Sequence, residues 1–300
     1  MSLVKTLTPT KITPYVKYVA IASLISQMML VATGGLVRLT GSGLGCPSWP
    51  KCTPGSLVNT PAMGIHGVIE FTNRTLTGVL SVIAVMMVAA VWRYRAERKD
   101  LWILSILLLL GIPAQAVVGG ITVLTDLNPW VVGFHFFVSI TMISLATLLV
   151  NRVYNGPRVS SALAEFPRGV LISIGIFGIT AIILGVFVTG SGPHAGDANA
   201  PRNGLDPLWI TRFHSASVWI LIALTVYGFM MIRQFPQLRK IEKPMMWLVM
   251  AEIIQAGIGY TQHLMGLPGA LVELHMIGAA ILTVAITYVI DEGVTYDYSK

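Results

Sequence analysis

Residues 101–124 read LWILSILLLLGIPAQAVVGGITVL, an apolar run with no charged side chain. At a rise of about 1.5 Å per residue, a helix of this length crosses the hydrocarbon layer of a bilayer, which is about 30 Å thick. A helix on the surface of a soluble protein would carry a charged face, and this run has none. The stretch therefore predicts a transmembrane helix, and it sets the class of protein in which the rest of the chain is interpreted.

Seven further apolar runs have a similar length. Because unpaired backbone polar groups are costly in hydrocarbon, each run is expected to be helical. With the first run, the predicted spans are 15–38, 64–92, 101–124, 130–151, 169–189, 207–232, 244–264 and 269–290. The sequence thus predicts an all-α polytopic membrane protein with eight transmembrane helices.

The composition excludes the other broad classes of protein. Residues of the AVILMFWYC set make up 54% of the 300 residues and charged residues only 11%, whereas soluble proteins carry about 25% charged residues. So little charge cannot cover a water-facing globule, and a disordered chain would be less apolar. Two cysteines are too few for a disulfide-rich scaffold. The net charge of +7 requires no nucleic-acid partner, because cytoplasmic loops of membrane proteins are basic.

The Lys and Arg residues gather on one side of the predicted membrane. With loops assigned alternately, 15 of the 20 basic residues fall on one side, 3 on the other and 2 inside spans. The positive-inside rule assigns the basic side to the cytoplasm. We therefore expect both termini to be cytoplasmic and the loops at 39–63 and 190–206 to be external.

The chain contains an internal repeat. Gln115 precedes His135 by 20 residues, and Gln255 precedes His275 by the same interval, 140 positions further on. The tetrapeptide TGSG that follows the first span recurs after the fifth span at an offset of 149. The larger offset indicates extra residues in the first external loop, which also holds both cysteines.

Each repeat is expected to form one four-helix bundle, at residues 1–155 and 156–300. An even number of spans brings both halves into the membrane from the same side, so they are expected to be related by a pseudo-twofold axis along the membrane normal. Ligands in such proteins bind inside the bundle, between facing helices.

Three intramembrane histidines, His135, His214 and His275, lie at one depth, about 9–14 Å below the outer helix ends. A lone buried histidine is ordinarily a hydrogen-bonded packing residue. Three in one layer, two of them at repeat-equivalent positions, favour metal ligation instead, since neutral imidazole is a common metal ligand. Two imidazoles from facing helices can bind a heme iron axially.

The two halves differ at one position of this layer. Asn73 stands where the repeat, at an offset of 141, places His214. Asparagine is a poor iron ligand, so we expect a closed bis-histidine heme site formed by His214 and His275. In the first half we expect a site with one firm ligand, His135. An open or displaceable position suits reaction chemistry, and a closed one suits electron transfer.

Four other polar residues extend these candidate sites. Glu70 and Arg74 are four residues apart on one helix face, so they form either a structural ion pair or an acid/base group beside the reacting group. Arg74 and Arg212 could also bind heme propionates through their planar guanidinium groups. His66 lies outward of Asn73 and is either a substitute ligand or a rim residue.

The remaining polar residues receive simpler interpretations. Gln115 and Gln255 are expected to bridge helices by hydrogen bonds rather than to contact a ligand. Other polar groups are either assigned no role or placed at the membrane interface; these are Glu252, Glu273, His194 and His263.

Cys46 and Cys52 lie in the sequence CPSWPKC of the first external loop. The external side is oxidising, so a disulfide is the expected state. No Cys-x-x-Cys-His motif is present, so heme is not expected to be attached covalently. The disulfide is either a staple of the loop or a redox-active pair near the first-half site.

Three segments and the three histidines together resemble the heme A synthase family. The segments are GGLVRLTGSGL at 34–44, IEFTNR at 69–74 and VTGSGPHAGD at 188–197. The resemblance spans nearly the whole chain. It implies two four-helix halves and oxidation of the C8 methyl of heme o to the formyl group of heme a, by successive hydroxylations with oxygen from water. Many members have histidine where this chain has Asn73, and the external cysteine pair resembles a bacterial subgroup.

The resemblance also implies roles for individual residues. His214 and His275 would hold a heme b cofactor, and His135 would hold the substrate heme with Glu70 as the catalytic residue. Asn73, Arg74 and His66 would line the same substrate site.

The resemblance implies partners and a location as well. The partners would be heme o and heme a, heme O synthase, cytochrome oxidase assembly factors, an electron acceptor and another copy of the chain, and the location would be the cell membrane.

Two other classes of protein fit part of the pattern. A di-heme b-type electron-transfer cytochrome explains the histidine layer but not the asymmetry at Asn73. A transporter explains the repeat and the intramembrane polar groups, but it would show no heme absorption band. The absorption spectrum of the purified protein and identification of its hemes separate the three hypotheses.

Overall fold

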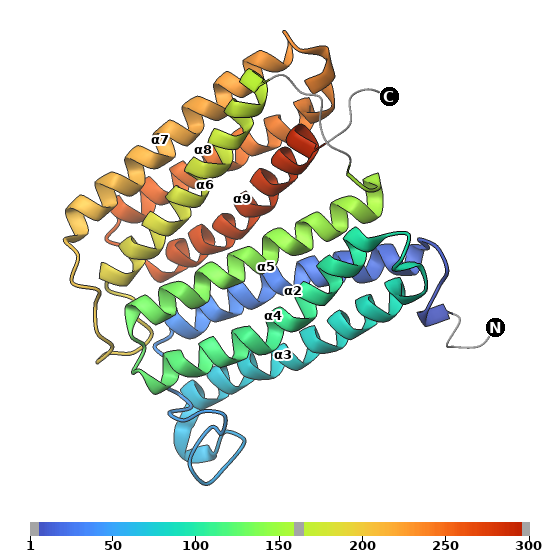
Figure 1. The fold of residues 1–300 in the computed structure, drawn as a ribbon. Helices are drawn as coiled ribbons and strands as arrows, with labels where there is room; N and C mark the ends of the chain where they lie inside the picture. The colour runs from blue at the N-terminus through green and yellow to red at the C-terminus, as the bar shows by residue number, and fades with distance from the viewer. Residues whose placement is uncertain (1–5, 159–164, 296–300) are drawn as a thin grey trace. The chain divides into compact units, whose positions relative to one another are not determined.

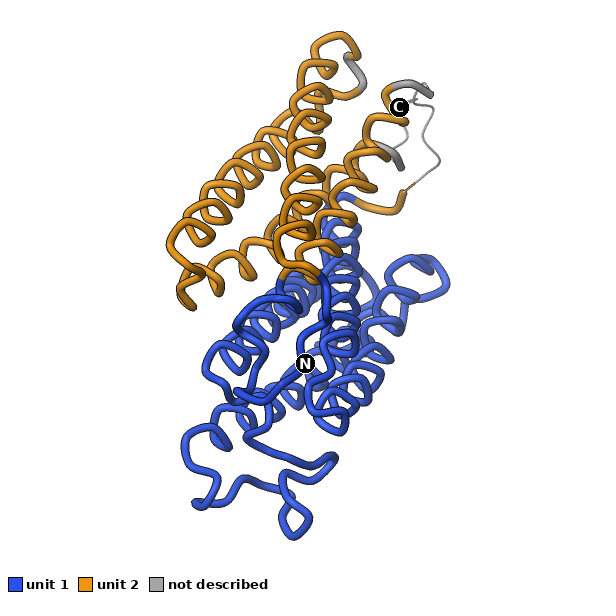
Figure 2. Tube along the Cα trace, turned by 90° about the vertical axis from the view of Figure 1, so that its left-hand side faces the viewer, with its two compact units in different colours: residues 1–155, 189–205 blue, residues 156–188, 206–300 orange. Residues whose placement is uncertain are grey.

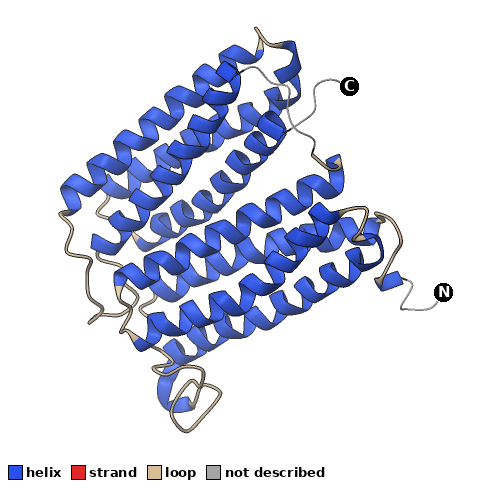
Figure 3. Cartoon of the chain, in the orientation of Figure 1, coloured by secondary structure: helices blue, strands red, loops and turns tan. Residues whose placement is uncertain are grey.

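A computed structural model describes residues 6–158 and 165–295. These ranges consist of helices joined by loops, with no strand among them (Figures 1 and 3). Three short 3₁₀ helices accompany the long ones: η1 (Pro61–Met63), η2 (Trp92–Tyr94) and η3 (Pro236–Ile241). The long helices are α2 (Pro14–Leu39), α3 (Gly64–Val91), α4 (Lys99–Leu124), α5 (Pro129–Asn155), α6 (Glu165–Ser191), α7 (Pro207–Ile232), α8 (Glu242–Leu264) and α9 (Gly269–Thr295). Each predicted span coincides with one of these helices.

Within the described ranges, seven of the eight long helices are long and apolar enough to cross a membrane. Their outward faces are apolar too: on α4, Ile103 is 55% exposed and Leu110 is 61% exposed. The protein is therefore an all-α polytopic membrane protein. The exception is α8, which is less apolar because Glu252, Gln255 and His263 interrupt it. Its crossing of the membrane stays a prediction.

Proline and capping residues fix several helix starts. Pro14 and Pro207 occupy the first turns of α2 and α7, where the missing backbone N–H is not needed. The carboxylate of Asp206 accepts hydrogen bonds from the backbone N–H groups of Leu208 (2.8 Å) and Trp209 (3.1 Å). These local signals explain why the predicted helix boundaries agree closely with the structure.

The chain forms two compact units (Figure 2). Unit 1 comprises residues 1–155 and 189–205, and unit 2 comprises residues 156–188 and 206–300. The first border between the units falls after Asn155, and the division into a substrate-heme half and a heme b half stays a prediction. The structure differs from the prediction in one segment: the 189–205 loop, expected in the second half, belongs to unit 1. Side-chain contacts described below explain this difference.

In unit 1, helices α2 to α5 form a closed ring. Helix α2 packs on α3 and α5, and α4 packs on the same two helices. Helices α3 and α5 are therefore diagonal to one another. A buried apolar cluster fills the end of the bundle at which α2 and α4 begin, and it includes Val16, Met87, Leu101 and Leu149. The opposite end, at which α3 and α5 begin, carries the predicted polar residues, and we call it the site end.

Unit 2 repeats this plan with α6 to α9. Helix α8 packs on α7 and α9. On α6, Gly175 and Gly178 lie against Ile290 and Ile286 of α9. A buried apolar cluster again fills the end at which α6 and α8 begin, and it includes Ile174, Met245 and Leu248. The site end of unit 2 is therefore the end at which α7 and α9 begin.

The turns that join the last two helices of each unit repeat as well. The backbone N–H of Leu127 donates to the carbonyl of Thr122 (2.8 Å), and that of Leu267 donates to the carbonyl of Gln262 (2.7 Å). Leu127 and Leu267 both have positive φ angles, 59° and 64°, and so do the residues before them, Asp126 and Gly266. The offset of 140 found in the sequence is thus an offset between equivalent backbone positions.

Candidate functional site

The site end of unit 2 brings two histidines from different helices close together. His214 comes from α7 and His275 from α9, and their ring centroids are 6.4 Å apart with the rings nearly perpendicular, at 88°. Metal–imidazole bonds are about 2 Å long, so this separation leaves room for a metal ion between the inward nitrogens. The pair therefore fits axial ligation of one iron.

Hydrogen bonding leaves the Nε2 of His214 free for ligation. The Nδ1 of His214 lies 2.9 Å from the carbonyl oxygen of Ala181 on α6. A carbonyl accepts and cannot donate, so Nδ1 carries the proton and Nε2 keeps its lone pair. The Nδ1 of His275 is buried without a hydrogen-bond partner among the described residues.

Glycines on neighbouring helices make room for both rings. A Cβ atom at Gly185 of α6 would lie 3.1 Å from Cε1 of His214, and one at Gly259 of α8 would lie 3.2 Å from Cε1 of His275. Such separations are tighter than ordinary van der Waals contact, so larger residues would move the imidazoles. The glycines thus set where the two rings lie.

Unit 1 builds the same surroundings for a single histidine, His135 of α5. A Cβ atom at Gly119 of α4 would lie 3.1 Å from its Cε1, and Gly119 precedes Gly259 by the repeat offset of 140. The Nε2 of Gln115 donates to the backbone carbonyl of His135 (3.4 Å) and to Ser139 (2.6 Å). In unit 2, Gln255 donates to the carbonyl of His275 in the same way (2.9 Å). Both glutamines bridge helices, as expected.

The residue at the position equivalent to His214 is tied to its neighbouring helix. The hydroxyl of Thr33 on α2 donates to Oδ1 of Asn73 on α3, at 2.7 Å. In unit 2 the corresponding helix, α6, provides the carbonyl of Ala181 that holds His214. The two units therefore share one scaffold and differ in the group presented at this position.

Glu70 and Arg74 form an ion pair on α3, and the pair holds the cysteine loop. One oxygen of Glu70 accepts from the backbone N–H of Cys46 at 2.6 Å. Arg74 donates to the carbonyls of Cys46 (2.9 Å) and Ser48 (2.9 Å). Glu70 is buried, with 5% of its surface exposed. The carboxylate is thus placed at the site end by contacts with the loop.

The cysteine loop packs against the bundle. Cys46 and Cys52 form a buried disulfide, as expected from the sequence. The ring of Trp49 lies against Gly120 of α4, where a Cβ atom would overlap it. Gly120 is the neighbour of Gly119, which contacts His135. The loop is therefore seated directly beside the histidine site of unit 1.

His66 and Arg212 lie near the starts of α3 and α7. The Nδ1 of His66 is 2.9 Å from the hydroxyl of Ser42, so this histidine contacts the loop that follows α2. Arg212 is exposed, and its guanidinium lies 5.1 Å from the ring centroid of Trp209. Their proposed contacts with a ligand stay predictions.

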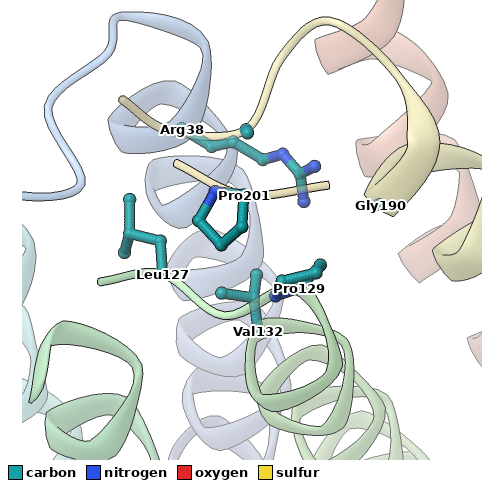
Figure 4. A pocket seen from close by; sticks show the side chains of 7 residues that line it. Arg38, Leu127, Pro129, Val132, Gly190 and Pro201 are labelled. Carbon is teal, nitrogen blue, oxygen red and sulfur yellow. The ribbon is translucent and has the colours of Figure 1, made fainter. Parts of the chain in front are cut away.

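Arg38 was not singled out from the sequence, yet it attaches the 189–205 loop to unit 1. Its guanidinium donates to the carbonyl of Thr189 (2.8 Å) and to that of His194. The backbone N–H of Gly43 donates to the carbonyl of Gly196 (2.8 Å). Figure 4 shows Arg38 beside Gly190 and Pro201 at the pocket that these segments line with Leu127, Pro129 and Val132.

Sequence reasoning also missed the contact residues Thr33, Trp49 and Gly185. Nothing in the sequence signals them, because each contact joins segments distant in the chain. Gly119 and Gly259 could have been found, since the repeat offset relates them as it relates the histidines that they contact.

The fold and these sites define an integral membrane protein with a histidine site built twice, in a form suited to heme iron. The chain belongs to the family described as cytochrome oxidase assembly protein, whose model matches residues 17–204. That match covers the site residues of unit 1 and ends before His214 and His275.

Several curated relatives are named heme A synthase. The chain is 29% identical to the heme A synthase of Listeria welshimeri over 167 residues, which cover 55% of this chain and 54% of the relative. It is 33% identical to that of Lysinibacillus sphaericus over 140 residues, covering 45% and 43%. It is 28% identical to that of Bacillus mycoides over 137 residues, covering 45% and 43%. The chain thus spans about half the length of these relatives.

Proposed function

We propose that the protein is a heme A synthase, which oxidises the C8 methyl group of heme o to the formyl group of heme a for cytochrome oxidase biogenesis. The observation that carries the proposal is a histidine site built twice on one scaffold. In unit 2 a second imidazole completes the site, whereas in unit 1 Asn73 stands at the position of that second imidazole. The name shared by the curated relatives agrees with it.

In this proposal His214 and His275 hold a resident heme b. Such a bis-histidine heme supplies one-electron transfer when bound. The residues around it keep it in place: Ala181 fixes the tautomer of His214, while Gly185 and Gly259 leave space for the two rings. Gln255 ties the backbone at His275 to α8. The chain thereby presents two imidazoles in fixed positions, which lowers the reorganisation needed on binding.

Heme o is the substrate of unit 1, and His135 holds it. Each hydroxylation inserts the oxygen of one water molecule and releases two electrons and two protons, so the methyl becomes a hydroxymethyl group and then a hydrated aldehyde. Loss of water from the hydrated aldehyde gives the formyl group. The electrons leave through an electron acceptor. His66 and Arg74 lie on the same helix as Asn73 and would contact the substrate at the rim of the bundle, and Arg212 would bind a propionate in unit 2.

Glu70 supplies the negative charge for this reaction. Its carboxylate lies one helical turn from Asn73, at the site end. Oxidation of the methyl develops positive charge at its carbon, and a fixed carboxylate stabilises that charge and can orient the attacking water. The contact with Cys46 and the ion pair with Arg74 fix the carboxylate in position, so the cysteine loop acts as the positioning element of the site.

The proposal includes a location and partners. The excess of Lys and Arg on one side of the predicted membrane supports a cell-membrane location with both termini in the cytoplasm. Heme O synthase would deliver the substrate, and cytochrome oxidase assembly factors would receive the product.

The test is conversion by the purified, membrane-reconstituted protein. We expect the isolated protein to contain heme b and to convert added heme o to heme a, with ¹⁸O from labelled water in the hydroxymethyl intermediate, whose oxygen does not exchange with solvent. Chromatography and mass spectrometry of extracted hemes measure both. A protein that binds two hemes b and leaves heme o unchanged would instead be a di-heme electron-transfer cytochrome.

A further inference from the structure

We propose that unit 1 holds its heme iron by His135 alone, and that Asn73, fixed by Thr33, donates a hydrogen bond from Nδ2 to a small ligand on the open side of the iron. The ligand class is a small molecule with a lone pair, such as water or carbon monoxide. The inference rests on the proposed function in one respect, that unit 1 takes a heme.

The first step is that position 73 faces His135. The repeat relates α3 to α7 and α5 to α9, and in unit 2 those helices bring His214 and His275 together. The surroundings of His135 and His275 agree in their glycine contacts and in their glutamine hydrogen bonds. Helices α3 and α5 are diagonal across unit 1. Asn73 therefore stands across the bundle from His135.

The second step concerns the direction of the Asn73 amide. The Thr33 hydroxyl lies 2.7 Å from Asn73 Oδ1, closer than its 3.0 Å distance to the carbonyl of Met29. A separation of 2.7 Å is typical of an O–H···O hydrogen bond and short for an N–H···O bond, so the hydroxyl donates to Oδ1 and the accepting end of the amide is turned towards α2. The Nδ2 atom is then free of the Thr33 contact, and it is a donor without a lone pair for iron.

The third step is the chemical consequence. An imidazole at this position, as in unit 2, would close the second axial site of the iron. The NH₂ group of an amide leaves that axial site open and can donate a hydrogen bond to the small ligand that binds there. In the proposed reaction, this places a hydrogen-bond donor where a water molecule can be held next to the substrate heme.

Carbon monoxide is the probe for the test, because it binds reduced heme iron only at an open axial position. We expect the reduced, heme-loaded full-length protein to bind it at one heme and not at the bis-histidine heme. Asn73→Leu keeps the size of the side chain but removes the donor. We expect it to bind carbon monoxide with a higher C–O stretching frequency and about tenfold faster release, the factor that one ordinary hydrogen bond supplies.

Three further variants guard against a folding defect. Thr33→Val removes the hydroxyl that orients the amide and should shift the C–O frequency in the same direction as Asn73→Leu. Asn73→His should abolish carbon monoxide binding in unit 1. The matched change in unit 2, His214→Asn, should open that heme to carbon monoxide.

Two results would overturn the inference: no carbon monoxide binding by the wild-type protein, or identical C–O frequencies in wild type, Asn73→Leu and Thr33→Val. Heme a formation is scored separately on the same samples. If heme a forms but the C–O frequency does not depend on Asn73, this inference is wrong and the proposed function stands. If the C–O frequency depends on Asn73 but no heme a forms, the proposed function is wrong and the heme site with its open axial position stands.

Discussion

At the scale of single residues, two kinds of polar group occupy the site ends. His135, His214 and His275 sit in spaces left by glycines, and Glu70 is held between Arg74 and the backbone of Cys46. The histidines are the proposed iron ligands, whereas the carboxylate has structural contacts as well as a proposed chemical role. Substitutions of these residues therefore have to distinguish the loss of a structural contact from the loss of a chemical role.

Replacing Glu70 with Gln tests the charge of the carboxylate. The amide keeps the size of the side chain and can still accept from Cys46, but the ion pair with Arg74 is lost. We expect heme a formation to fall by about 10²–10³-fold, the usual effect of removing one electrostatic stabiliser, with heme b retained. Chromatography of extracted hemes measures both.

Glu252→Gln is the matched control, since Glu252 is also a buried glutamate, bonded to Thr225 at 2.8 Å in unit 2. The rate at which a thiol reduces the Cys46–Cys52 disulfide tells whether the loop has opened in Glu70→Gln. Wild-type turnover in Glu70→Gln would leave the Glu70–Arg74 pair with a structural role only.

Gly259 tests how closely the ring of His275 must be placed. An alanine Cβ would lie 3.2 Å from Cε1 of the histidine, so Gly259→Ala must displace the imidazole. We expect about tenfold weaker retention of heme b, as for other changes next to a metal ligand, and an altered low-spin absorption spectrum. Gly257→Ala is the control on the same helix, because a Cβ atom there meets no atom within 4 Å. Equal spectra in the two variants would contradict the conclusion that Gly259 leaves the space for the His275 ring.

At the scale of elements, the cysteine loop and α4 act together. The disulfide closes the loop, but the loop is seated on the bundle by Arg74, by Glu70 and by Trp49 on Gly120. A loop held by contacts on two helices is more fixed than a disulfide alone would make it, because a disulfide restricts only the chain between its cysteines.

Gly120→Ala tests this seating without touching the loop sequence. The added methyl group would overlap the Trp49 ring, so the ring must leave α4. We expect the disulfide of the folded protein to be reduced by a thiol about tenfold faster, since the rate depends on access to the sulfurs. Gly78→Ala, on α3, adds a methyl group that meets no atom within 4 Å. It should react like the wild type, and a wild-type rate in Gly120→Ala would refute the seating.

At the scale of the whole molecule, two units of one plan hold different sites. Each unit has its own apolar cluster at one end and its own histidine site at the other. The ligands of one site are not shared with the other among the described residues. If each site holds a heme as proposed, the two hemes should therefore be lost independently.

This independence can be measured with one alanine variant in each unit. His214→Ala deletes one axial ligand of the unit 2 site and should remove the low-spin heme b. His135→Ala should leave the low-spin heme b spectrum unchanged and abolish binding of added heme o. Spectra and extracted heme content after purification report both. Loss of both hemes in either variant would show that the sites are coupled, and an unchanged low-spin spectrum in His214→Ala would remove it as a ligand.

The sequence alone determined the helices, the repeat and the histidine layer. Helix boundaries follow from apolar runs ended by polar residues and opened by Pro14 and Pro207, and these signals are local. The offset of 140 that relates Gln115 and His135 to Gln255 and His275 is a property of the sequence, and the structure reproduces it in hydrogen bonds. The crossing of the membrane by α8, the least apolar of the eight long helices, stays a prediction.

The tertiary structure alone decided which groups these residues meet. The hydrogen bond of Thr33 to Asn73, the seating of Trp49 on Gly120 and the attachment of the 189–205 loop by Arg38 all join segments far apart in the chain. Helix periodicity fixes the face on which a side chain lies, but not which neighbour packs against that face. That choice depends on the packing of whole helices, whereas the difference between Asn73 in unit 1 and His214 in unit 2 is already visible in the sequence.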